Sequence, residues 1–323
     1  MAGVSRATVS RVINGAPNVR PEARAAVEQA IAQLGYTPNR AARSLVTRRT
    51  DAIALVVCEP EARLFAEPFF AAVVRGMSVA AGDADKSLVL LVAQDERERE
   101  RARRYLHRDH VDGVVLMSLH GDDPLPRQLR QVEMPTVLVG RPLGHPDVPY
   151  VDADNRGGAR VAVEHLHRLG RNTIATITGP QEMCAGVDRY EGYHDGIVAL
   201  GLEDDEELVA EGDFGETSGY EAMTALLARR PDVDGVFVAS DLMASGALRA
   251  LRDAGRDVPG EVALVGFDDI PLARHTLPAL TTVRQPLDQM TRATARLLLQ
   301  SIAGGSRTEH VICPTTLVRR KSA

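Results

Sequence analysis

Adjacent carboxylates are the first residues whose type and spacing could support chemistry. Asp268 and Asp269 follow the apolar run "VALVGF" and could act as a general acid and base. However, neighbouring side chains at the end of an extended strand point to opposite sides, and no nucleophile accompanies them. His165 and His167 in "EHLH" could bind a metal, but residues i and i+2 lie on different faces of a helix. We therefore expect neither a catalytic nor a metal site.

Other reactive features also favour a chain that is not an enzyme. The turns "TGPQ" and "GGAR" contain glycine but lack the spacing of a phosphate-binding loop, so we expect no cofactor. The three cysteines are far apart and have no CxxC spacing: Cys58, Cys184 and Cys313. No apolar run reaches 18 residues, and the start has no apolar signal region. We expect a cytoplasmic location, without disulfides, zinc or a membrane span.

Arginines near the start offer a different chemistry. Residues 1–50 contain eight arginines and two glutamates, a net charge of +6, and the whole chain of 323 residues carries −6, which leaves −12 for the remainder. A basic segment on an acidic body suggests binding to a polyanion such as nucleic acid. A solvated basic tail is the alternative. By contrast, the mixed run "DERERERARR" at 95–104 is typical of a solvated helix face.

Apolar spacing predicts the elements that carry these arginines. Ser5 is a natural N-cap and Gly15 a natural stop for a first helix, whose apolar stripe is Val9, Val12 and Ile13. A second helix begins at Pro21 and ends at Gly35, with the apolar face Val27, Ala30, Ile31 and Leu34. A third basic segment, "PNRAARSLVTRRT", precedes the first strand.

From residue 51 onward, short apolar runs alternate with helical stretches. "AIALVV", "GVVLMS", "TIATITG" and "GVFVAS" are continuous apolar runs, as expected of parallel strands buried on both faces. Alternation of this kind predicts doubly wound parallel sheets in an α/β fold. The pattern occurs twice, before and after residue 153, which indicates two similar lobes. A ligand would then bind in the cleft between them, beyond the carboxyl ends of the strands.

The first segment resembles a known family of DNA-binding proteins. "AGVSRATVSRVING", followed by "VRPEARAAVEQAIAQLGYTPNRAARSL", is similar to the head-piece of the LacI/GalR family of bacterial repressors. The resemblance implies that the first helix enters the major groove of an operator, and that "PNRAARSL" is a hinge helix with Leu45 as a minor-groove wedge. Core packing is the alternative role for Leu45. The DNA contacts implied are Ser5, Arg6, Ala7, Thr8, Ser10, Arg11, Asn14, Asn39, Arg40, Ala42 and Leu45.

One departure from the family pattern concerns the start of the head-piece. The family has about eleven residues before "AGVS", which form the first helix of the helix-turn-helix, whereas Met1 stands where that helix should end. We therefore expect this helix to be missing from the sequence. Without it, the stripe that includes Val9 and Val12 loses half of its packing partner, and operator binding is expected to be weak.

The same resemblance extends over the body, which is similar to a periplasmic-binding-protein-like core. "DRYEGYHDGI" and "VALVGFDDIPLARHTLPALTTVRQP" carry it, and the second of these marks the crossover between lobes. It implies effector contacts by Phe69, Phe70, Arg141, Arg189, Ser240, Asp241, Asp268 and Gln285. Each has another possible role: Asp241 or Asp268 could cap a helix, Arg189 could form a surface ion pair, and Phe70 could be core. Aromatic faces with Asp and Arg are typical of sugar sites.

Together these features predict a ligand-controlled DNA-binding regulator. We expect a head-piece at 1–38, a hinge at 39–50 and an effector core at 51–323, with lobe 1 at about 51–152 and 284–312 and lobe 2 at about 153–283 and 313–323. The implied partners are operator DNA, a sugar effector and a second copy of the chain. "YVDADNRGGAR" resembles actinobacterial repressors of oligosaccharide use, such as that of cello-oligosaccharides. A cytoplasmic solute-binding protein with a non-functional DNA-binding segment is the alternative.

Overall fold

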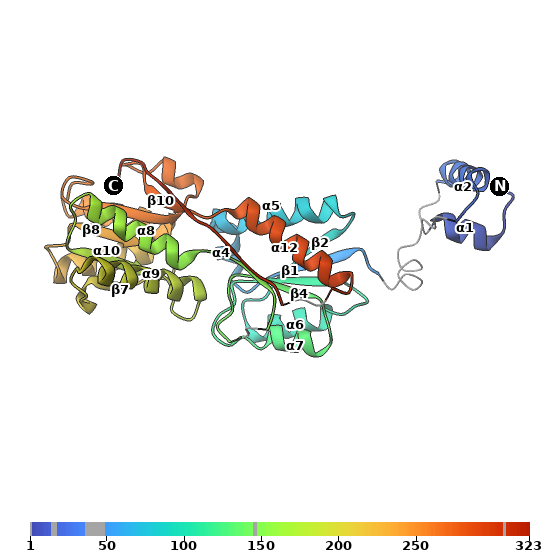
Figure 1. Cartoon of the computed structure of the whole chain (residues 1–323), viewed down its shortest axis with the longest axis horizontal. Coiled ribbons are helices and arrows are strands. Elements are labelled where there is room, and N and C mark those ends of the chain that lie inside the picture. Colours follow the sequence, from blue (N-terminus) through green and yellow to red (C-terminus); the bar gives the residue numbers. More distant parts are fainter. Residues whose placement is uncertain (1, 14–17, 36–48, 145–146, 306–307) are drawn as a thin grey trace.

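The computed structural model describes residues 2–13, 18–35, 49–144, 147–305 and 308–323. In Figure 1, two short helices form a small unit apart from two larger α/β lobes. Five residues expected to contact DNA lie outside the described residues: Asn14, Asn39, Arg40, Ala42 and Leu45. In the described part of the chain, no helix is both long and apolar enough to cross a membrane.

The small unit consists of α1 (Arg6–Ile13) packed on α2 (Pro21–Leu34). Ser5 caps α1 as expected, because its Oγ accepts a 3.2 Å hydrogen bond from the Thr8 N–H. Gly35 ends α2 in the left-handed conformation, with φ of 58°. Val12 and Val27 are buried in the contact, whereas Leu34 is 58% exposed because two short helices cover only part of each apolar face.

Lobe 1 is a parallel sheet with helices on both faces. Its strand order is β11-β5-β4-β3-β1-β2. The strands are β1 (Ala52–Val57), β2 (Ser87–Val92), β3 (Gly113–Met117), β4 (Thr136–Val139), β5 (Tyr150–Ala153) and β11 (His310–Cys313). One face packs on α5 (Pro68–Asp83) and α12 (Leu287–Ile302), and the other on α6 (Glu96–Tyr105) and α7 (Leu125–Gln131). The helix α4 (Glu61–Ala66), which the pattern did not predict, precedes α5.

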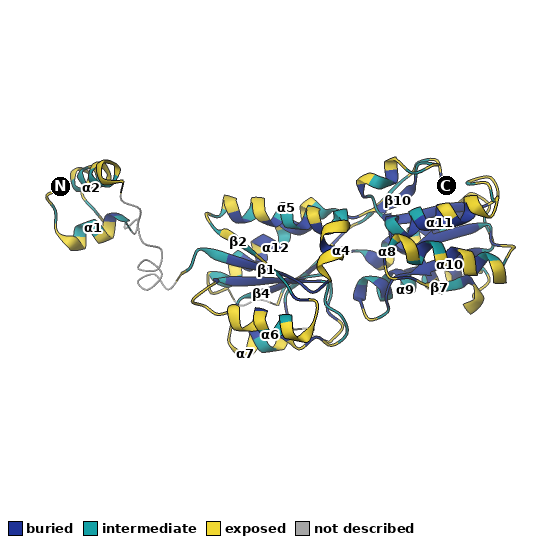
Figure 2. Cartoon of the chain, turned by 180° about the vertical axis from the view of Figure 1, so that it is seen from behind, coloured by how far each residue is buried: buried dark blue, intermediate teal, exposed yellow. Residues whose placement is uncertain are grey.

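Lobe 2 repeats this architecture, with strand order β12-β10-β9-β8-β6-β7. All pairs are parallel except β10 with β12. The strands are β6 (Ile174–Thr178), β7 (Val209–Glu211), β8 (Gly235–Val238), β9 (Ala263–Asp268), β10 (Thr281–Arg284) and β12 (Thr316–Val318). The helices α8 (Asn155–Arg168) and α9 (Cys184–Leu200) cover one face, and α10 (Glu216–Arg229) and α11 (Asp241–Asp253) cover the other. Figure 2 shows both sheets buried between partly exposed helices.

The chain passes between the lobes three times. It leaves lobe 1 between β5 and α8, returns between β10 and α12, and leaves again between β11 and β12. The strand β5 ends at Ala153, β10 ends at Arg284 and β11 ends at Cys313, and each passage follows directly. As a result, the carboxyl ends of the parallel strands of both sheets face a shared space, where loops from both lobes meet.

Candidate functional site

A cavity of about 950 Å³, including space open to solvent, lies between the two lobes. Lobe 1 contributes residues that follow β3 and β4 and the segment around the start of α5. Lobe 2 contributes the starts of α8, α9 and α11 and the segments after β7 and β9. Seven of the eight residues expected to contact an effector line this cavity: Phe69, Phe70, Arg141, Arg189, Ser240, Asp268 and Gln285.

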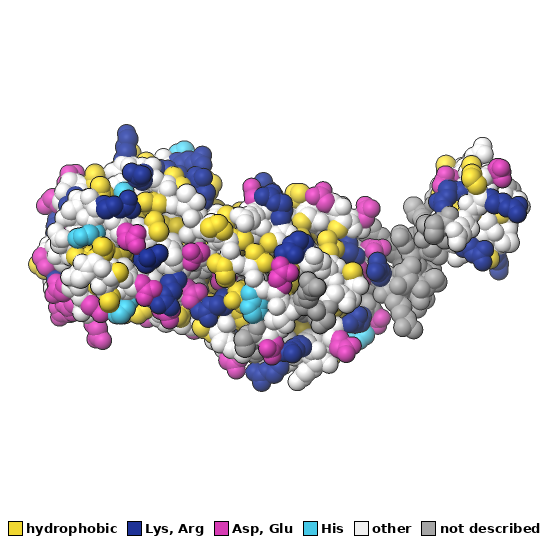
Figure 3. Space-filling view, viewed as in Figure 1, with side chains coloured by type: hydrophobic (Ala, Val, Ile, Leu, Met, Phe, Trp, Pro, Cys, Tyr) yellow, Lys and Arg dark blue, Asp and Glu magenta, His cyan; other side chains and the backbone are white. Residues whose placement is uncertain are grey.

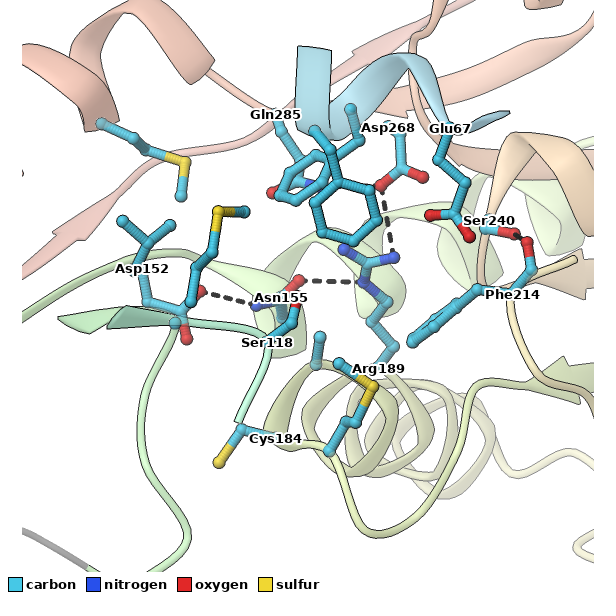
Figure 4. Close-up of a pocket in the computed structure, with 18 of the residues that line it drawn as sticks. Glu67, Ser118, Asp152, Asn155, Cys184, Arg189, Phe214, Ser240, Asp268 and Gln285 are labelled. Atoms are coloured by element: carbon cyan, nitrogen blue, oxygen red, sulfur yellow. Dashed lines mark hydrogen bonds and ion pairs between the residues drawn. The ribbon is translucent and has the colours of Figure 1, made fainter. Parts of the chain in front are cut away.

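Arg189 of α9 is the central polar residue of the lobe 2 wall. Its Nε donates a 2.9 Å hydrogen bond to Asn155 Oδ1, and its Nη1 lies 3.3 Å from Asp268 Oδ1 (Figure 4). Its guanidinium stacks on the ring of Phe267, 3.8 Å from the ring centroid. The side chain is buried, so the surface ion pair considered above is wrong. Burial lowers the pKa of Arg189, and the nearby Asp268 partly offsets that effect.

Asp268 is held at the end of β9 in an unusual backbone conformation, with φ of 114°. Gln285 Nε2 donates a 2.7 Å hydrogen bond to Asp268 Oδ1, the oxygen that also faces Arg189. Burial raises the pKa of Asp268, while Arg189 and Gln285 act in the opposite direction. The neighbouring Asp269 faces away and pairs with Arg284 at 2.6 Å and with Arg320. The two carboxylates therefore point apart, as the sequence predicted.

The two residues of "ASD" have different positions. Ser240 lines the cavity and also caps α11, because its Oγ accepts a 3.2 Å hydrogen bond from the Met243 N–H. Asp241 is fully buried and lies behind the cavity wall rather than in it. Its carboxylate accepts hydrogen bonds of 2.9 Å from the Ile270 N–H and 2.5 Å from Thr282 Oγ1. Asp241 thus anchors the segment after Asp268, in place of the effector contact that the resemblance implied.

Phe214 is a cavity residue that the sequence did not indicate. It follows β7 in a turn, with φ of 69°, and its carbonyl accepts a 3.0 Å hydrogen bond from Ser240 Oγ. Its ring centroid lies 5.6 Å from the Arg189 guanidinium carbon and 5.5 Å from that of Arg63. A Cβ added to Gly179 would lie 2.2 Å from this ring, so the glycine of "TGPQ" makes room for it. The packing of Phe214 on this distant glycine left no signal in the local sequence pattern.

Aromatic rings and a cross-lobe ion pair form part of the lobe 1 wall. The rings of Phe69 and Phe70 pack edge to face at 5.4 Å; Phe70 is buried and Phe69 half-buried. Phe70 therefore belongs to both the core and the cavity wall. The guanidinium of Arg141 crosses to lobe 2 and pairs with Asp188 at 2.5 Å, while its backbone N–H donates to Asp152. Burial raises the pKa of Asp152 to about 6.

Two charged residues of the cavity belong to the unpredicted helix α4 and the residue after it. Arg63 Nε lies 2.5 Å from Glu67 Oε1, and both side chains line the cavity. Burial raises the pKa of Glu67 to about 7, although Arg63 opposes this shift. Cys184 also lines the cavity, and burial raises the pKa of its thiol to about 12, so the thiol stays protonated near neutral pH.

On α1, the residues expected to contact DNA face outward. Arg6, Ala7, Ser10 and Arg11 are exposed, and Thr8 is half-buried. Ser5 Oγ lies 3.0 Å from Thr8 Oγ1, so these two hydroxyls also satisfy each other. Figure 3 shows basic side chains on this unit and mixed charges on the visible face of both lobes. In the described ranges, no group of three His, Cys, Asp or Glu side chains is placed to hold a metal ion.

Comparison with known proteins agrees with both parts of the chain. Residues 1–39 match the family "bacterial regulatory proteins, lacI family", and residues 163–323 match a periplasmic binding protein-like domain. The regulator CelR of Thermobifida fusca is 53% identical over 100% of this chain and 96% of its own length. The regulator GalR of Escherichia coli is 35% identical over 100% and 93%.

Solved structures show the same relationship in three dimensions. A CelR–cellobiose complex has a TM-score of 0.83 and 50% identity, covering 100% of this chain and 97% of that one. A lac repressor dimer bound to operator and the anti-inducer ONPF has a TM-score of 0.84 and 27% identity, covering 99% and 96%. These relatives are regulators rather than enzymes, and the match runs from the small helical unit through both lobes. The chain belongs to the lacI family of bacterial transcriptional regulators.

Proposed function

We propose that this protein binds an operator through α1 and releases or holds it according to occupancy of the cleft by a β-linked gluco-oligosaccharide such as cellobiose. The observation that carries the proposal is the polar cluster of Arg189, Asp268 and Gln285 beside the Phe214 ring, inside a cavity shared by two lobes. The cellobiose bound to the related CelR supports the choice of sugar.

The chemistry of the cavity suits a carbohydrate. A planar guanidinium with fixed N–H donors matches pairs of neighbouring hydroxyl oxygens, and a carboxylate accepts hydroxyl protons. Arg189 and Asp268 supply both, and Gln285 adds an amide. The rings of Phe69 and Phe214 offer apolar faces for the C–H side of a sugar ring. The space between the lobes is open to solvent, so a sugar can enter it and contact both walls.

The exposed face of α1 supports the DNA-binding role. Arg6, Ala7 and Arg11 are free of the contact with α2 and form a basic surface suited to the major groove. The hinge function of 39–50, with Leu45 as a wedge, remains part of the proposal. A pseudopalindromic operator has two half-sites, so we infer a homodimer in the cytoplasm.

Control of DNA binding requires that the sugar favour one arrangement of the lobes. A ligand that contacts both walls binds the closed cleft more tightly, and this difference shifts the equilibrium between closed and open lobes. A coupling free energy of about 1–3 kcal/mol would change operator affinity by roughly 5- to 150-fold.

The proposal is tested by selecting duplexes from a random library with the full chain and then titrating sugars. We expect a pseudopalindrome to be enriched, and cellobiose or cellotriose to change its affinity, whereas the α-linked disaccharide maltose does not. Selection of no palindrome would contradict the operator function. Enrichment of a palindrome whose binding ignores all β-linked glucans would leave the regulator but reject this effector. It would then favour a search for another ligand of the same cleft.

A further inference from the structure

Outside the cavity, a histidine bridges two carboxylates that belong to different lobes. His120 follows β3 of lobe 1, and its Nε2 lies 3.2 Å from Oε1 of Glu59, which follows β1 in the same lobe. Its Nδ1 lies 3.5 Å from Oε1 of Glu182, which follows β6 in lobe 2. The backbone strengthens this contact, because the Gly121 N–H donates a 2.7 Å hydrogen bond to the Glu182 carbonyl. None of these residues lines the cavity.

The geometry of the bridge depends on the charge of the imidazole. A neutral imidazole has one N–H and can donate to only one carboxylate, while its other nitrogen presents a lone pair to the second. A protonated imidazole donates from both nitrogens. Accordingly, hydrogen bonding to Glu59 raises the pKa of His120 despite its partial burial, and Glu182 adds to the effect.

The bridge also reaches the cavity through a series of charged groups. Glu59 is only 1% exposed and accepts a 3.0 Å hydrogen bond from Arg63 Nη1 through its second oxygen. Arg63 in turn pairs with Glu67 in the cavity wall and faces the Phe214 ring of lobe 2. Glu59 therefore connects the His120–Glu182 contact between the lobes with Arg63 and Glu67, which would touch an effector.

We propose that His120, as an imidazolium, is a latch that holds the two lobes closed, so that binding of the effector in the cleft takes up a proton. This inference rests on the proposed function in one respect: it requires a ligand whose binding closes the cleft. His120 is a positioning residue, because it acts through closure and not through contact with the sugar. Its charged neighbours are Glu59 with Arg63 behind it, Glu182 from lobe 2, and Asp122 on its own loop, which pairs with Arg127.

The sign of the pH dependence follows from the contacts that opening would break. Opening the lobes separates His120 from Glu182 but leaves Glu59 in place, because Glu59 and His120 share lobe 1. The pKa of His120 is then higher in the closed form than in the open form. Between these two values the closed form binds more protons, so effector affinity falls as pH rises.

Titration of the full chain with cellobiose at pH 6 and pH 8, in buffers of different ionisation enthalpy, tests the latch. We expect wild-type affinity to fall about fivefold or more from pH 6 to pH 8, with proton uptake on binding. His120→Gln and Glu182→Gln should each reduce this pH dependence. Neither should abolish it, because Glu67 and Asp152 titrate nearby and remain in both variants. Glu182→Gln keeps the backbone contact and changes an exposed side chain, so it does not threaten folding.

His194→Gln is the matched control. His194 pairs with Asp204 at 2.9 Å within lobe 2, so its loss should leave the pH profile unchanged. A wild-type profile in both His120→Gln and Glu182→Gln would overturn the latch. If cellobiose binds at neither pH, the proposed effector is wrong, and energy transfer between dyes placed on the two lobes of the ligand-free chain decides the latch separately. There, the closed fraction must fall from pH 6 to pH 8 in the wild type and fall less in Glu182→Gln, and equal pH dependence in the two proteins would overturn the latch.

Discussion

The two walls of the cleft are built differently. The lobe 2 wall is a buried network in which Arg189 is 4% exposed and contacts Asn155, Asp268 and the Phe267 ring. The lobe 1 wall has half-buried ion pairs, such as Arg63 with Glu67, and its Arg141 reaches across to Asp188. Both walls are polar, and Arg63 finds its partners Glu59 and Glu67 within lobe 1. The walls differ in that the Arg189 network is more deeply buried, whereas Arg141 of lobe 1 finds its carboxylate partner in lobe 2.

This difference suggests that the two walls have different roles in binding an effector. Arg189, Asp268 and the Phe267 ring all belong to lobe 2, so their mutual geometry can persist whether the cleft is open or closed and can present a preformed surface to a ligand. Ion pairs that cross the cleft exist only when the lobes meet, so they report and stabilise closure. We therefore expect lobe 2 to recognise the effector and lobe 1 to respond to closure of the cleft. Substitutions on the two walls should then have distinguishable effects.

The largest effect should come from the lobe 2 network. Arg189→Ala leaves the buried carboxylate of Asp268 without its cationic partner, so we expect a loss of about 3–5 kcal/mol in the free energy of unfolding and no detectable effector binding. Chemical denaturation and calorimetric titration measure these. Arg156→Ala is the control, because its pairs with Glu191 and Asp195 are exposed and should cost under about 1 kcal/mol. Equal losses in both variants would contradict a special role for burial.

The next effect compares the aromatic residues of the two walls. Phe214→Ala removes a ring that contacts two guanidinium groups, and we expect effector affinity to fall by about tenfold or more. Phe69→Ala removes a half-buried ring that packs edge-on against Phe70, and about a twofold to threefold loss should result. Titration of both variants with the same sugar measures the difference. A larger loss for Phe69→Ala would reverse the assignment of recognition to lobe 2.

A smaller effect should appear in the pH dependence of stability. The pKa of Glu67 is raised from 4.5 to about 7, so the folded state binds more protons than the unfolded state between these values, and stability falls as pH rises through that window. Glu67→Gln should reduce this fall by about 1 kcal/mol per pH unit at its steepest, and Asp152, with its pKa raised to about 6, accounts for part of the fall that remains. Denaturation at several pH values measures it. Glu61→Gln, at the exposed start of the preceding helix α4, should keep the wild-type slope; if Glu67→Gln also keeps it, Glu67 is ionised throughout.

The smallest effect should come from the ion pair that crosses the cleft. Arg141→Ala removes the pair with Asp188 but retains the backbone N–H that serves Asp152. Because the Arg141 side chain is 37% exposed, we expect a loss of under about 1 kcal/mol in effector binding, and less at high salt. Effector titrations at low and high ionic strength measure it. A loss that ignores salt would mean that Arg141 binds the effector directly.

Sequence patterns predicted the fold, and the family resemblance supplied the effector residues, whose positions have a clear physical reason. Parallel strands buried on both faces are continuous apolar runs, so the polar residues that end them, such as Ser240 and Asp268, are easily placed at the edge of the sheet. The resemblance also placed Asp241 in the wall. It could not tell a side chain that faces the cavity from one that anchors the loop behind it.

The residues that sequence reasoning missed lie where periodicity is short or absent. The helix α4 has six residues, too few for a recognisable apolar stripe, so Arg63 was not considered. Phe214 lies in a turn with positive φ, and Asn155 begins α8 as one of several polar residues in "DADNRGG". Their roles depend on contacts with distant segments, which local patterns do not record.

Two lobes joined by a single segment could reorient freely, whereas two lobes joined by three segments have far fewer relative motions available. The chain passes between the lobes after β5, after β10 and after β11. These three crossover segments restrict the relative motion of the lobes to a hinge rotation and keep the lobes together. A sugar that gains a few contacts on closing can therefore set the orientation of the whole first lobe, and with it the spacing between two DNA-reading helices in a pair of chains.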